Sequence, residues 1–214
     1  MLADRFVLQN PFLRKAQKVS GHYKKTSWTA PQFSEIQKRV IRMYSNDKVI
    51  LEPLTENDAD FFYGIYSHPQ LTVNFDDSPF LPNETPSEFT KRIISICEFI
   101  FTIRPKENRD LIVGDCALHH WNKETNEIVI GGSLFPEYWG LGLMQSAFEL
   151  LTAVAKHELG VKTLLGPTKT RNFKAIRLVE KWGFTKTKWN RMTPSCEKTY
   201  DHDATNFVAD LYEV

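Results

Sequence analysis

The residues whose types and spacing point to chemistry form one short glycine-bearing turn. Trp139, Gly140, Leu141, Gly142 and Leu143 lie between a segment of strand-forming residues and a long amphipathic segment. Two glycines one residue apart let the backbone turn sharply, and successive amides of such a turn point together into the space before a helix. These amides and the positive end of the helix dipole bind phosphate without a basic side chain. The turn predicts an anion site, although two glycines also suit a plain turn.

The elements that hold this turn follow from hydrophobic periodicity. Runs of strand-forming residues separated by polar turns predict an antiparallel meander over 99–104, 111–121 and 127–134. After the glycine turn, helical spacing and a closing glycine predict a helix over 143–159, followed by a strand at 163–165 and a helix over 172–182. Strands near 184–191 and 207–212 complete the chain. We therefore expect an α+β fold with a mixed, mostly antiparallel sheet flanked by helices.

Two earlier helices are indicated by capping boxes. Thr55 with Asp58, and Thr85 with Glu88, have the spacing in which a hydroxyl and a carboxylate satisfy each other's backbone amides. The first follows a short strand beginning at Val49. The second helix should end near Glu98, where strand formers begin.

Length and composition favour one domain with an N-terminal arm. The chain has 214 residues, of which 42% are hydrophobic and 25% charged, which is typical of globular proteins and excludes a disordered or coiled-coil chain. No apolar run approaches the roughly 18 residues of a membrane span, and no signal peptide is apparent, so we expect a cytoplasmic protein. The three cysteines fit neither a disulfide framework nor a Cys-x-x-Cys motif. Asp201, His202 and Asp203 have no further ligands nearby, so no metal site is predicted.

The arm, residues 1–47, is basic, whereas the body, residues 48–214, is acidic. A basic arm suits RNA or an acidic partner. Apolar residues such as Phe6, Phe12 and Trp28 alternate with its charges, however, and favour an arm packed on the body. Nucleic-acid binding is therefore not favoured.

The second half of the chain resembles the GNAT superfamily of acetyl-CoA-dependent N-acetyltransferases, and within it the ribosomal-protein alanine acetyltransferases. The most specific matches are the sequence IGGSLFPEYWGLG at 130–142 and the sequence RNFKAIRLVEKWGF at 171–184. The sequence LEPLTENDADFFYGIYSHPQ at 51–70 also matches. The resemblance covers about residue 49 to the end, and the arm lies outside it.

The resemblance implies a sheet that splays between its fourth and fifth strands and holds the pantetheine arm of acetyl-CoA in the gap. It implies that backbone groups of Leu134 and Phe135 bond the pantetheine, and that the Asn172 side chain reaches it. Asn172 also stands where a helix N-cap belongs, and capping alone would explain it. The amides implied to hold the pyrophosphate are those of Trp139, Gly140, Leu141, Gly142, Leu143 and Met144.

The family's reaction is direct attack of a neutral amine on the thioester carbon, with a backbone amide of the fourth strand holding the oxyanion. The acceptor would be a protein N-terminus or a small-molecule amine. Three positions depart from the family. Met144 replaces a small residue, Val179 replaces the tyrosine that many relatives use as acid, and Ala175 replaces a serine used by others. The alternative is thus an acetyl-CoA-binding or regulatory module that has lost turnover.

The general base is open on sequence alone. Relatives often carry a glutamate at Val129, and Glu127 lies on the same face of that strand, so Glu127 is the first candidate. Asp76 and Asp77 are second candidates, as base or as recognition groups for a cationic amine. His119 and His120 are expected on opposite faces of a strand, so that at most one faces the cleft. A C-terminal strand at 207–212 would allow a homodimer if it forms a sheet edge.

Overall fold

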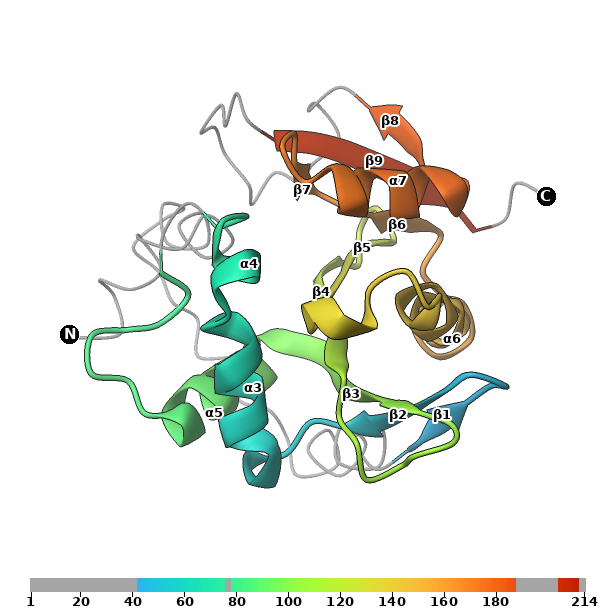
Figure 1. The fold of residues 1–214 in the computed structure, drawn as a ribbon. Coiled ribbons are helices and arrows are strands. Elements are labelled where there is room, and N and C mark those ends of the chain that lie inside the picture. Colours follow the sequence, from blue (N-terminus) through green and yellow to red (C-terminus); the bar gives the residue numbers. More distant parts are fainter. Residues whose placement is uncertain (1–41, 76–77, 188–203, 212–214) are drawn as a thin grey trace, which may run out of the picture.

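The structure of the protein, a computed structural model, describes residues 42–75, 78–187 and 204–211. Within these residues the strands form one sheet in the order β1-β2-β3-β4-β5-β6-β9-β7, and β8 pairs with β9 (Figure 1). The strands are β1 Tyr44–Ser45, β2 Val49–Pro53, β3 Cys97–Pro105, β4 Gly114–Asn122, β5 Glu127–Leu134, β6 Thr163–Leu165, β7 Thr168–Lys169, β8 Thr185–Thr187 and β9 Ala204–Asp210. Among the described residues, β5 pairs with β6 in parallel, and the other strand pairs are antiparallel.

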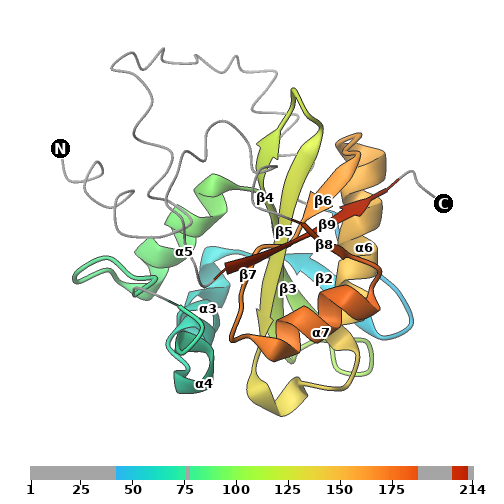
Figure 2. The ribbon, with the colours of Figure 1, turned by 90° about the horizontal axis from the view of Figure 1, so that it is seen from above.

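Helices cover both faces of this sheet, as two perpendicular views show (Figures 1 and 2). They are the 3-10 turns η1 Glu56–Asp58 and η2 Pro136–Tyr138, and the helices α3 Ala59–Tyr66, α4 Pro69–Thr72, α5 Pro86–Ile96, α6 Leu143–Glu158 and α7 Phe173–Lys181. The first group, α3 to α5, lies on one side of the sheet, and α6 and α7 lie on the other. The predicted α+β fold with a mixed, mostly antiparallel sheet is confirmed.

Both predicted capping boxes form. The Thr55 amide donates to Asp58 Oδ2 at 2.9 Å, and the Thr85 amide donates to Glu88 Oε2 at 2.9 Å. These bonds satisfy amides that have no partner inside the first helical turn. They fix the starts of η1 and α5, and therefore the entry of the chain onto the α3–α5 face.

Two apolar layers hold the helices to the sheet. On the α6 face, Leu51, Phe101, Leu118, Ile128 and Leu151 are each less than 2% exposed. On the α3–α5 face the buried set is smaller and more aromatic, consisting of Leu54, Phe62, Ile65, Leu71, Phe89, Ile100 and Ala117. Successive side chains of β4 therefore point into the two layers in turn, as expected for a strand buried on both sides.

Several elements differ from the sequence prediction. The second meander strand begins at Gly114 rather than 111, because the Leu111 amide closes a turn onto the Asn108 carbonyl. α4 forms inside the proline-rich stretch because Pro69 occupies its first position, where no amide is needed, and the His68 side chain caps it. The short strands β1 and β7 have no sequence signal. Residues 1–41 of the predicted arm, Cys196 and 201–203 lie outside the described residues.

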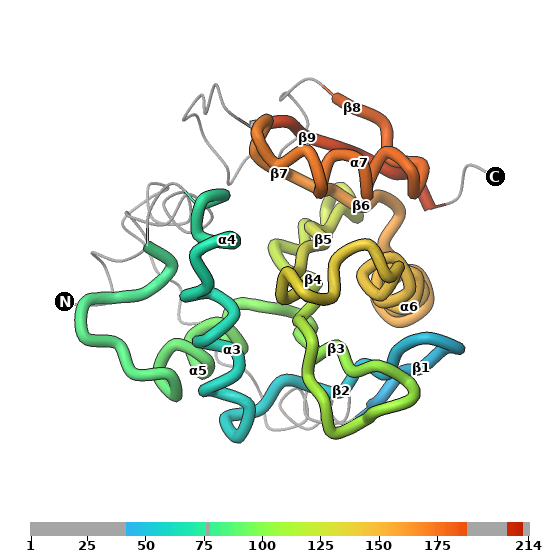
Figure 3. Tube along the Cα trace, in the orientation of Figure 1, coloured from blue at the N-terminus to red at the C-terminus, as the bar shows by residue number. Residues whose placement is uncertain are grey.

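The sheet opens between β5 and β6. These strands pair in parallel only from Glu127 with Thr163 to Val129 with Leu165. Beyond that point Gly166 donates to the Phe207 carbonyl of β9, so the chain leaves β5. The outer edge of β5 from Ile130 to Leu134 faces no strand among the described residues, which is the splay that the family resemblance implies. The trace of Figure 3 shows β5 and β6 between α4 and α7.

In the described residues, no helix combines the length and the apolar character that a membrane crossing requires.

Candidate active site

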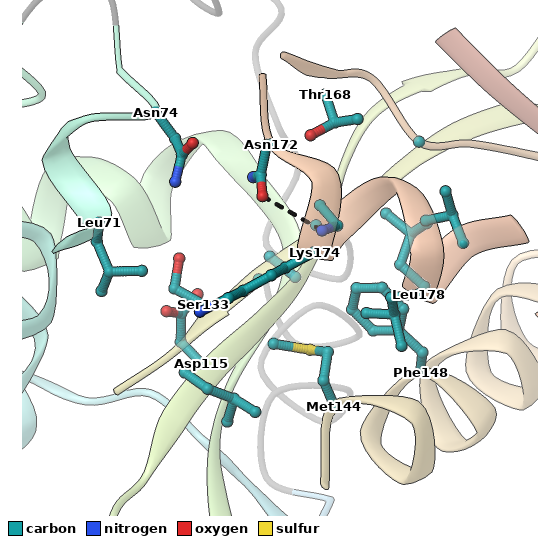
Figure 4. A pocket seen from close by; sticks show the side chains of 18 of the residues that line it. Leu71, Asn74, Asp115, Ser133, Met144, Phe148, Thr168, Asn172, Lys174 and Leu178 are labelled. Atoms are coloured by element: carbon teal, nitrogen blue, oxygen red, sulfur yellow. Dashed lines mark hydrogen bonds between the residues drawn. The ribbon is translucent and has the colours of Figure 1, made fainter. Parts of the chain in front are cut away.

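A cavity of about 1530 Å³ follows the open edge of β5. Its lining comes from the β5 strand itself, the N-terminal turn of α6, the β7–α7 segment, and the face of α3, α4 and α5. Figure 4 shows Asp115 and Ser133 on the strands, Met144 and Phe148 on α6, and Leu178 on α7, all directed at this space. The cavity therefore joins the glycine turn to the α3–α5 face of the sheet.

The glycine turn presents free helix amides to the cavity. Gly140 and Gly142 adopt φ of 80° and 76°, in the left-handed region that favours glycine. Gly142 is the N-cap of α6, no side chain caps the helix, and the first amide bonded back along the helix is that of Ser146, which donates to Gly142. The amides of Leu143 and Met144 precede that bond, so they are available to an anion.

The residues predicted to hold the pyrophosphate differ in whether they line the cavity and in whether their amides are free. Trp139, Gly140, Gly142, Leu143 and Met144 line the cavity. The Trp139 amide, however, already donates to the Pro136 carbonyl at 3.2 Å. Leu141 lies outside this lining, with 58% of its surface exposed.

A lysine that sequence reasoning missed lies beside the turn. The Nζ of Lys48 is 3.1 Å from the point where a Cβ would stand on Gly142. Lys48 precedes β2 and is almost a hundred residues away in the chain, so no local motif joins it to the turn. Its ammonium group adds positive charge to the N-terminal end of α6.

The β7–α7 segment makes one wall of the cavity strongly basic. Among the described lining residues the lysines and arginines all belong to this segment, namely Lys169, Arg171, Lys174, Arg177 and Lys181, and the acidic side chain is Asp115 alone. The Lys174 Nζ lies 3.6 Å from the centre of the Trp139 ring, a cation–π contact between the wall and the glycine turn. Arg171 Nε donates to the Val73 carbonyl at 3.0 Å and ties this wall to the end of α4. The balance of charge suits a polyanionic ligand.

Asn172 is both a helix cap and a lining residue. Its Oδ1 accepts from the Ala175 amide at 3.2 Å, the dashed bond in Figure 4, and it is the N-cap of α7. An amide side chain has a separate NH₂ group, which the cap does not use. The capping role therefore leaves Nδ2 as a donor.

The open edge of β5 offers alternate backbone groups. The Phe135 amide donates to the Val113 carbonyl at 3.0 Å, which places residues 131, 133 and 135 in bonding register with β4. The amides of Ile130, Gly132 and Leu134 consequently point to the open side. The Leu134 carbonyl accepts from Trp139 Nε1 at 2.9 Å. Leu134 lines the cavity, whereas Phe135 does not, and both backbone groups of Phe135 already have protein partners.

A buried carboxylate that sequence reasoning did not single out lies next to this edge. Asp115 on β4 pairs directly with Ser133 on β5 and is 1% exposed. The Tyr66 hydroxyl donates to Asp115 Oδ2 at 3.4 Å. Burial raises the pKa of Asp115 to about 7, and it also raises the pKa of Tyr66 well above its usual value.

The prediction for the two histidines is wrong. His119 and His120 both line the cavity, with ring centres 4.8 Å apart. The β4–β5 register shifts after His119, and His120 adopts a φ of 55°. A bulge of this kind breaks the strict alternation of side chains along a strand. Burial, together with the neighbouring His120, lowers the pKa of His119 to about 3.

The three positions that depart from the family all contact the cavity. Met144 lines it and also packs against the α6 core layer. Val179 is 7% exposed in that layer, and Ala175 lies on the first turn of α7. Neither Val179 nor Ala175 carries an acidic group.

The first candidate base, Glu127, lies away from the cavity. Glu127 begins β5 at the end where β6 still pairs, and its Oε2 accepts from the Thr125 hydroxyl at 2.9 Å. It does not line the cavity. Asp76 and Asp77 lie outside the described residues. Among the described residues, no group of three or more His, Cys, Asp and Glu side chains forms a metal site.

Several solved structures with the same fold are described as acetyltransferases. A GNAT-family acetyltransferase from Bacillus anthracis is 15% identical, with a TM-score of 0.63 over 80% of this chain and 100% of that one. An acetyltransferase from Agrobacterium tumefaciens is 18% identical, with a TM-score of 0.61 over 79% and 94%. The spermidine N-acetyltransferase of Vibrio cholerae, solved with CoA and spermine, is 17% identical, with a TM-score of 0.61 over 78% and 97%.

A search of the curated proteins finds no significant match. The sequence family described as the acetyltransferase (GNAT) domain matches residues 48–185, which is more than half of the chain. This range holds the glycine turn, the open edge of β5 and the capped start of α7. The chain therefore belongs to the GNAT acetyltransferase family.

Proposed function

We propose that this protein is an N-acetyltransferase that transfers the acetyl group of acetyl-CoA to a primary amine. GNAT acetyltransferases use acetyl-CoA as co-substrate. The observation that carries the proposal is the continuity of the cavity, from the uncapped N-terminus of α6 along the unpaired edge of β5 to the α3–α5 face. Acetyl-CoA has the matching order of parts, a diphosphate, an amide-bearing arm and a terminal thioester.

Each part of the co-substrate has suitable partners in this arrangement. The amides of Leu143 and Met144, with the charge of Lys48, hold the pyrophosphate. The amides of Gly132 and Leu134 bond the pantetheine arm in the manner of an added strand, and Asn172 Nδ2 donates to it. The basic wall on α7 attracts the remaining phosphate.

The chemistry requires a neutral amine and a polarised thioester. A backbone amide on the open edge of β5, that of Ile130 or Gly132, donates to the thioester oxygen as charge builds on it. The amine attacks directly, so no covalent enzyme intermediate is involved. The departing sulfur needs no strong acid, because a thiolate with a pKa near ~8.5 is a good leaving group.

The acceptor class is the part of the proposal that rests on resemblance. The Pro-Glu-Tyr-Trp-Gly-x-Gly turn is similar to that of the ribosomal-protein alanine acetyltransferases, which favours a protein N-terminus, and a small-molecule amine suits the same chemistry. The competing function is a module that binds acetyl-CoA without turnover. It is favoured by Met144, whose side chain enters the cavity next to the glycine turn.

Calorimetric titration with CoA tests the proposal, and the chain offers a matched pair of variants. Gly142 and Gly160 flank the two ends of α6, with φ of 76° and 67°. Glutamate at either position incurs the same left-handed strain, about 1 to 2 kcal/mol, but only Gly142→Glu places a carboxylate at the anion site. We expect wild type and Gly160→Glu to bind CoA, and Gly142→Glu to lose binding.

Equal loss of affinity in both variants would attribute the effect to strain and count against the anion site. A folded wild-type protein that does not bind CoA would overturn the proposal. CoA binding without release of CoA from acetyl-CoA in the presence of amines would favour the module.

A further inference from the structure

Asp115 is a buried carboxylate with unused hydrogen-bonding capacity. It is 1% exposed, and within the described residues its Oδ1 has no hydrogen-bond partner. Its Oδ2 receives a long 3.4 Å bond from Tyr66, and backbone hydrogen bonding at Ser133 and Asp115 also acts on the carboxyl and lowers its pKa. A buried carboxylate without full hydrogen bonding is costly to the fold, so its presence calls for an explanation outside the resting structure.

Asp115 lies beside the part of the β5 edge where the proposed acetyl transfer takes place. Asp115 pairs directly with Ser133, which lies between Gly132 and Leu134 on the open edge of β5. The Cβ atoms of directly paired residues are about 4.5 to 5.5 Å apart, so the Asp115 side chain lies close to this edge. Asp115 and Ala117 are two residues apart on β4, so their side chains lie on the same face, and Ala117 packs in the layer of α3 and α5. Figure 4 shows Asp115 and Ser133 beside each other, with Leu71 and Asn74 across the space.

Apolar side chains predominate on the rest of this end of the cavity, and Gln70 and Asn74 are polar members of the same lining. Its lining on the α3–α5 side includes Leu71, Phe75, Phe89, Ile93 and Ile96. Such a surface, with one carboxylate at its inner end, fits a cation at the tip of an apolar stem better than a polar or anionic acceptor. An ammonium group would supply the hydrogen bonds that Oδ1 lacks.

We propose that Asp115 binds the ammonium group of an acceptor amine with an apolar stem and removes its proton before attack on the thioester. This inference rests on the proposed acetyl transfer, and it assigns the base to β4 rather than to Glu127 or to Asp76 and Asp77. Tyr66 is a positioning residue, because it holds the carboxylate through Oδ2 and does not itself take the proton.

The proton and electron balance is complete with these groups. The ammonium gives one proton to the Asp115 carboxylate, and the free amine forms a C–N bond with the thioester carbon. The C–S bond breaks, sulfur leaves with its electron pair, and one proton from the acylated nitrogen passes to the sulfur through solvent. The products are the acetamide and CoA, and the proton held by Asp115 returns to water.

The titration of the neighbouring groups supports this role. The titratable groups that the structure places against Asp115 are Tyr66 on α3, Cys97 on β3 and Cys116 next to it on β4. Burial raises the pKa of all three above their usual values, so they stay neutral near pH 7. Asp115, with its pKa raised by burial to about 7, is the member of this set that changes charge there.

The test uses 2-phenylethylamine as acceptor and follows CoA release from acetyl-CoA against pH. We expect Asp115→Asn to lower kcat/KM by about 10²- to 10⁴-fold and to remove the rise in rate near pH 7, with the Kd for CoA unchanged within about twofold. Tyr66→Phe should retain the rise but move it to higher pH, since the Tyr66 hydrogen bond lowers the pKa of Asp115. The matched control is Asp60→Asn, the same chemical change at an exposed position of α3 outside the cavity.

Each remaining outcome counts against a different statement. Wild-type activity in Asp115→Asn, or an unchanged pH profile, would overturn the role of Asp115. Wild type that binds CoA but does not acetylate 2-phenylethylamine would overturn the acceptor assignment and leave co-substrate binding intact. Wild type that does not bind CoA would overturn the proposed function itself.

Discussion

Lys48 Nζ and the missing Cβ of Gly142 are 3.1 Å apart, although almost a hundred residues separate the two in the chain. The strand β2 that follows Lys48 packs beneath α6, and this packing brings the lysine to the helix N-terminus. The flexible ammonium group of Lys48 and the fixed amides of the glycine turn thus lie close together. The sequence pattern of the turn predicts the amides but gives no sign of the lysine.

Lys48→Ala should weaken CoA binding through the loss of one exposed charge. An exposed ion pair contributes up to about 1 kcal/mol, which corresponds to about a fivefold rise in Kd. Because salt screens exposed charges, the difference from wild type should shrink as ionic strength rises. Calorimetry at two salt concentrations measures both effects. Lys106→Ala, which removes a neighbouring exposed lysine that is not placed against Gly142, is the control, and equal effects of the two variants would refute a specific contact.

Two substitutions at Asn172 should separate its capping role from its binding role. Asn172→Asp keeps an oxygen for the Ala175 amide but removes the Nδ2 donor, whereas Asn172→Ala removes both. We expect only Asn172→Ala to lose about 1 kcal/mol of unfolding free energy, and both variants to bind CoA more weakly. Urea unfolding and calorimetry report the two quantities. Full CoA affinity in Asn172→Asp would restrict the residue to capping.

The adjacent glycines Gly131 and Gly132 on β5 should differ in how strongly an added methyl group destabilises the fold. A Cβ on Gly132 would stand 2.4 Å from the Asp115 carbonyl oxygen, whereas a Cβ on Gly131 would meet only His119 Nε2 at 3.6 Å. Gly132→Ala therefore forces β4 and β5 apart and should cost about 1 to 3 kcal/mol, and Gly131→Ala should stay within about 0.5 kcal/mol of wild type. Urea unfolding at fixed pH decides the matter. Similar values for the two variants would contradict the close strand approach.

Asp115 and His119 should have opposite effects on stability as pH changes. The folded protein holds a proton on Asp115 between pH 3.8 and about 7 that the unfolded chain has released, so this group lowers the unfolding free energy as pH rises. Between about pH 3 and pH 6.5 the unfolded chain holds a proton on His119 that the folded protein has released. This group therefore raises the unfolding free energy as pH rises. Asp115→Asn should abolish the falling contribution, which amounts to at most about 4 kcal/mol at 1.4 kcal/mol per pKa unit.

The variant should consequently be more stable than wild type at pH 8, and its unfolding free energy should rise between pH 4 and 6.5. Urea titrations across pH 4 to 8 give the comparison. A constant difference between the two proteins over this range would mean that the pKa of Asp115 is not raised by folding.

The sequence predicts the local parts of this fold well because their signals are local. Thr85 and Glu88 satisfy each other within one helical turn, and Gly160 ends α6 where the periodicity stops. The glycine turn is likewise readable, since Gly140 and Gly142 need left-handed backbone that other residues resist.

The rest depends on contacts that no spacing encodes. Asp115 is the second residue of β4, and its place beside the cavity becomes visible only through the pairing with Ser133 and the approach of Tyr66. The two histidines of β4 contradict simple alternation because a bulge, invisible in the sequence, reverses one of them. Glu127 lies at the end of β5 where β6 still pairs, and its distance from the cavity depends on that long-range pairing rather than on its place in the strand pattern.

The unpaired stretch of β5 also affects how the protein should be handled. The unpaired amides of β5 form an open strand edge, and open edges recruit strands from other chains. CoA bound there would cover this edge and, by binding only the folded state, raise the midpoint of thermal unfolding. The co-substrate should therefore act as a solubility factor, and preparations stripped of CoA should aggregate sooner on heating than saturated ones.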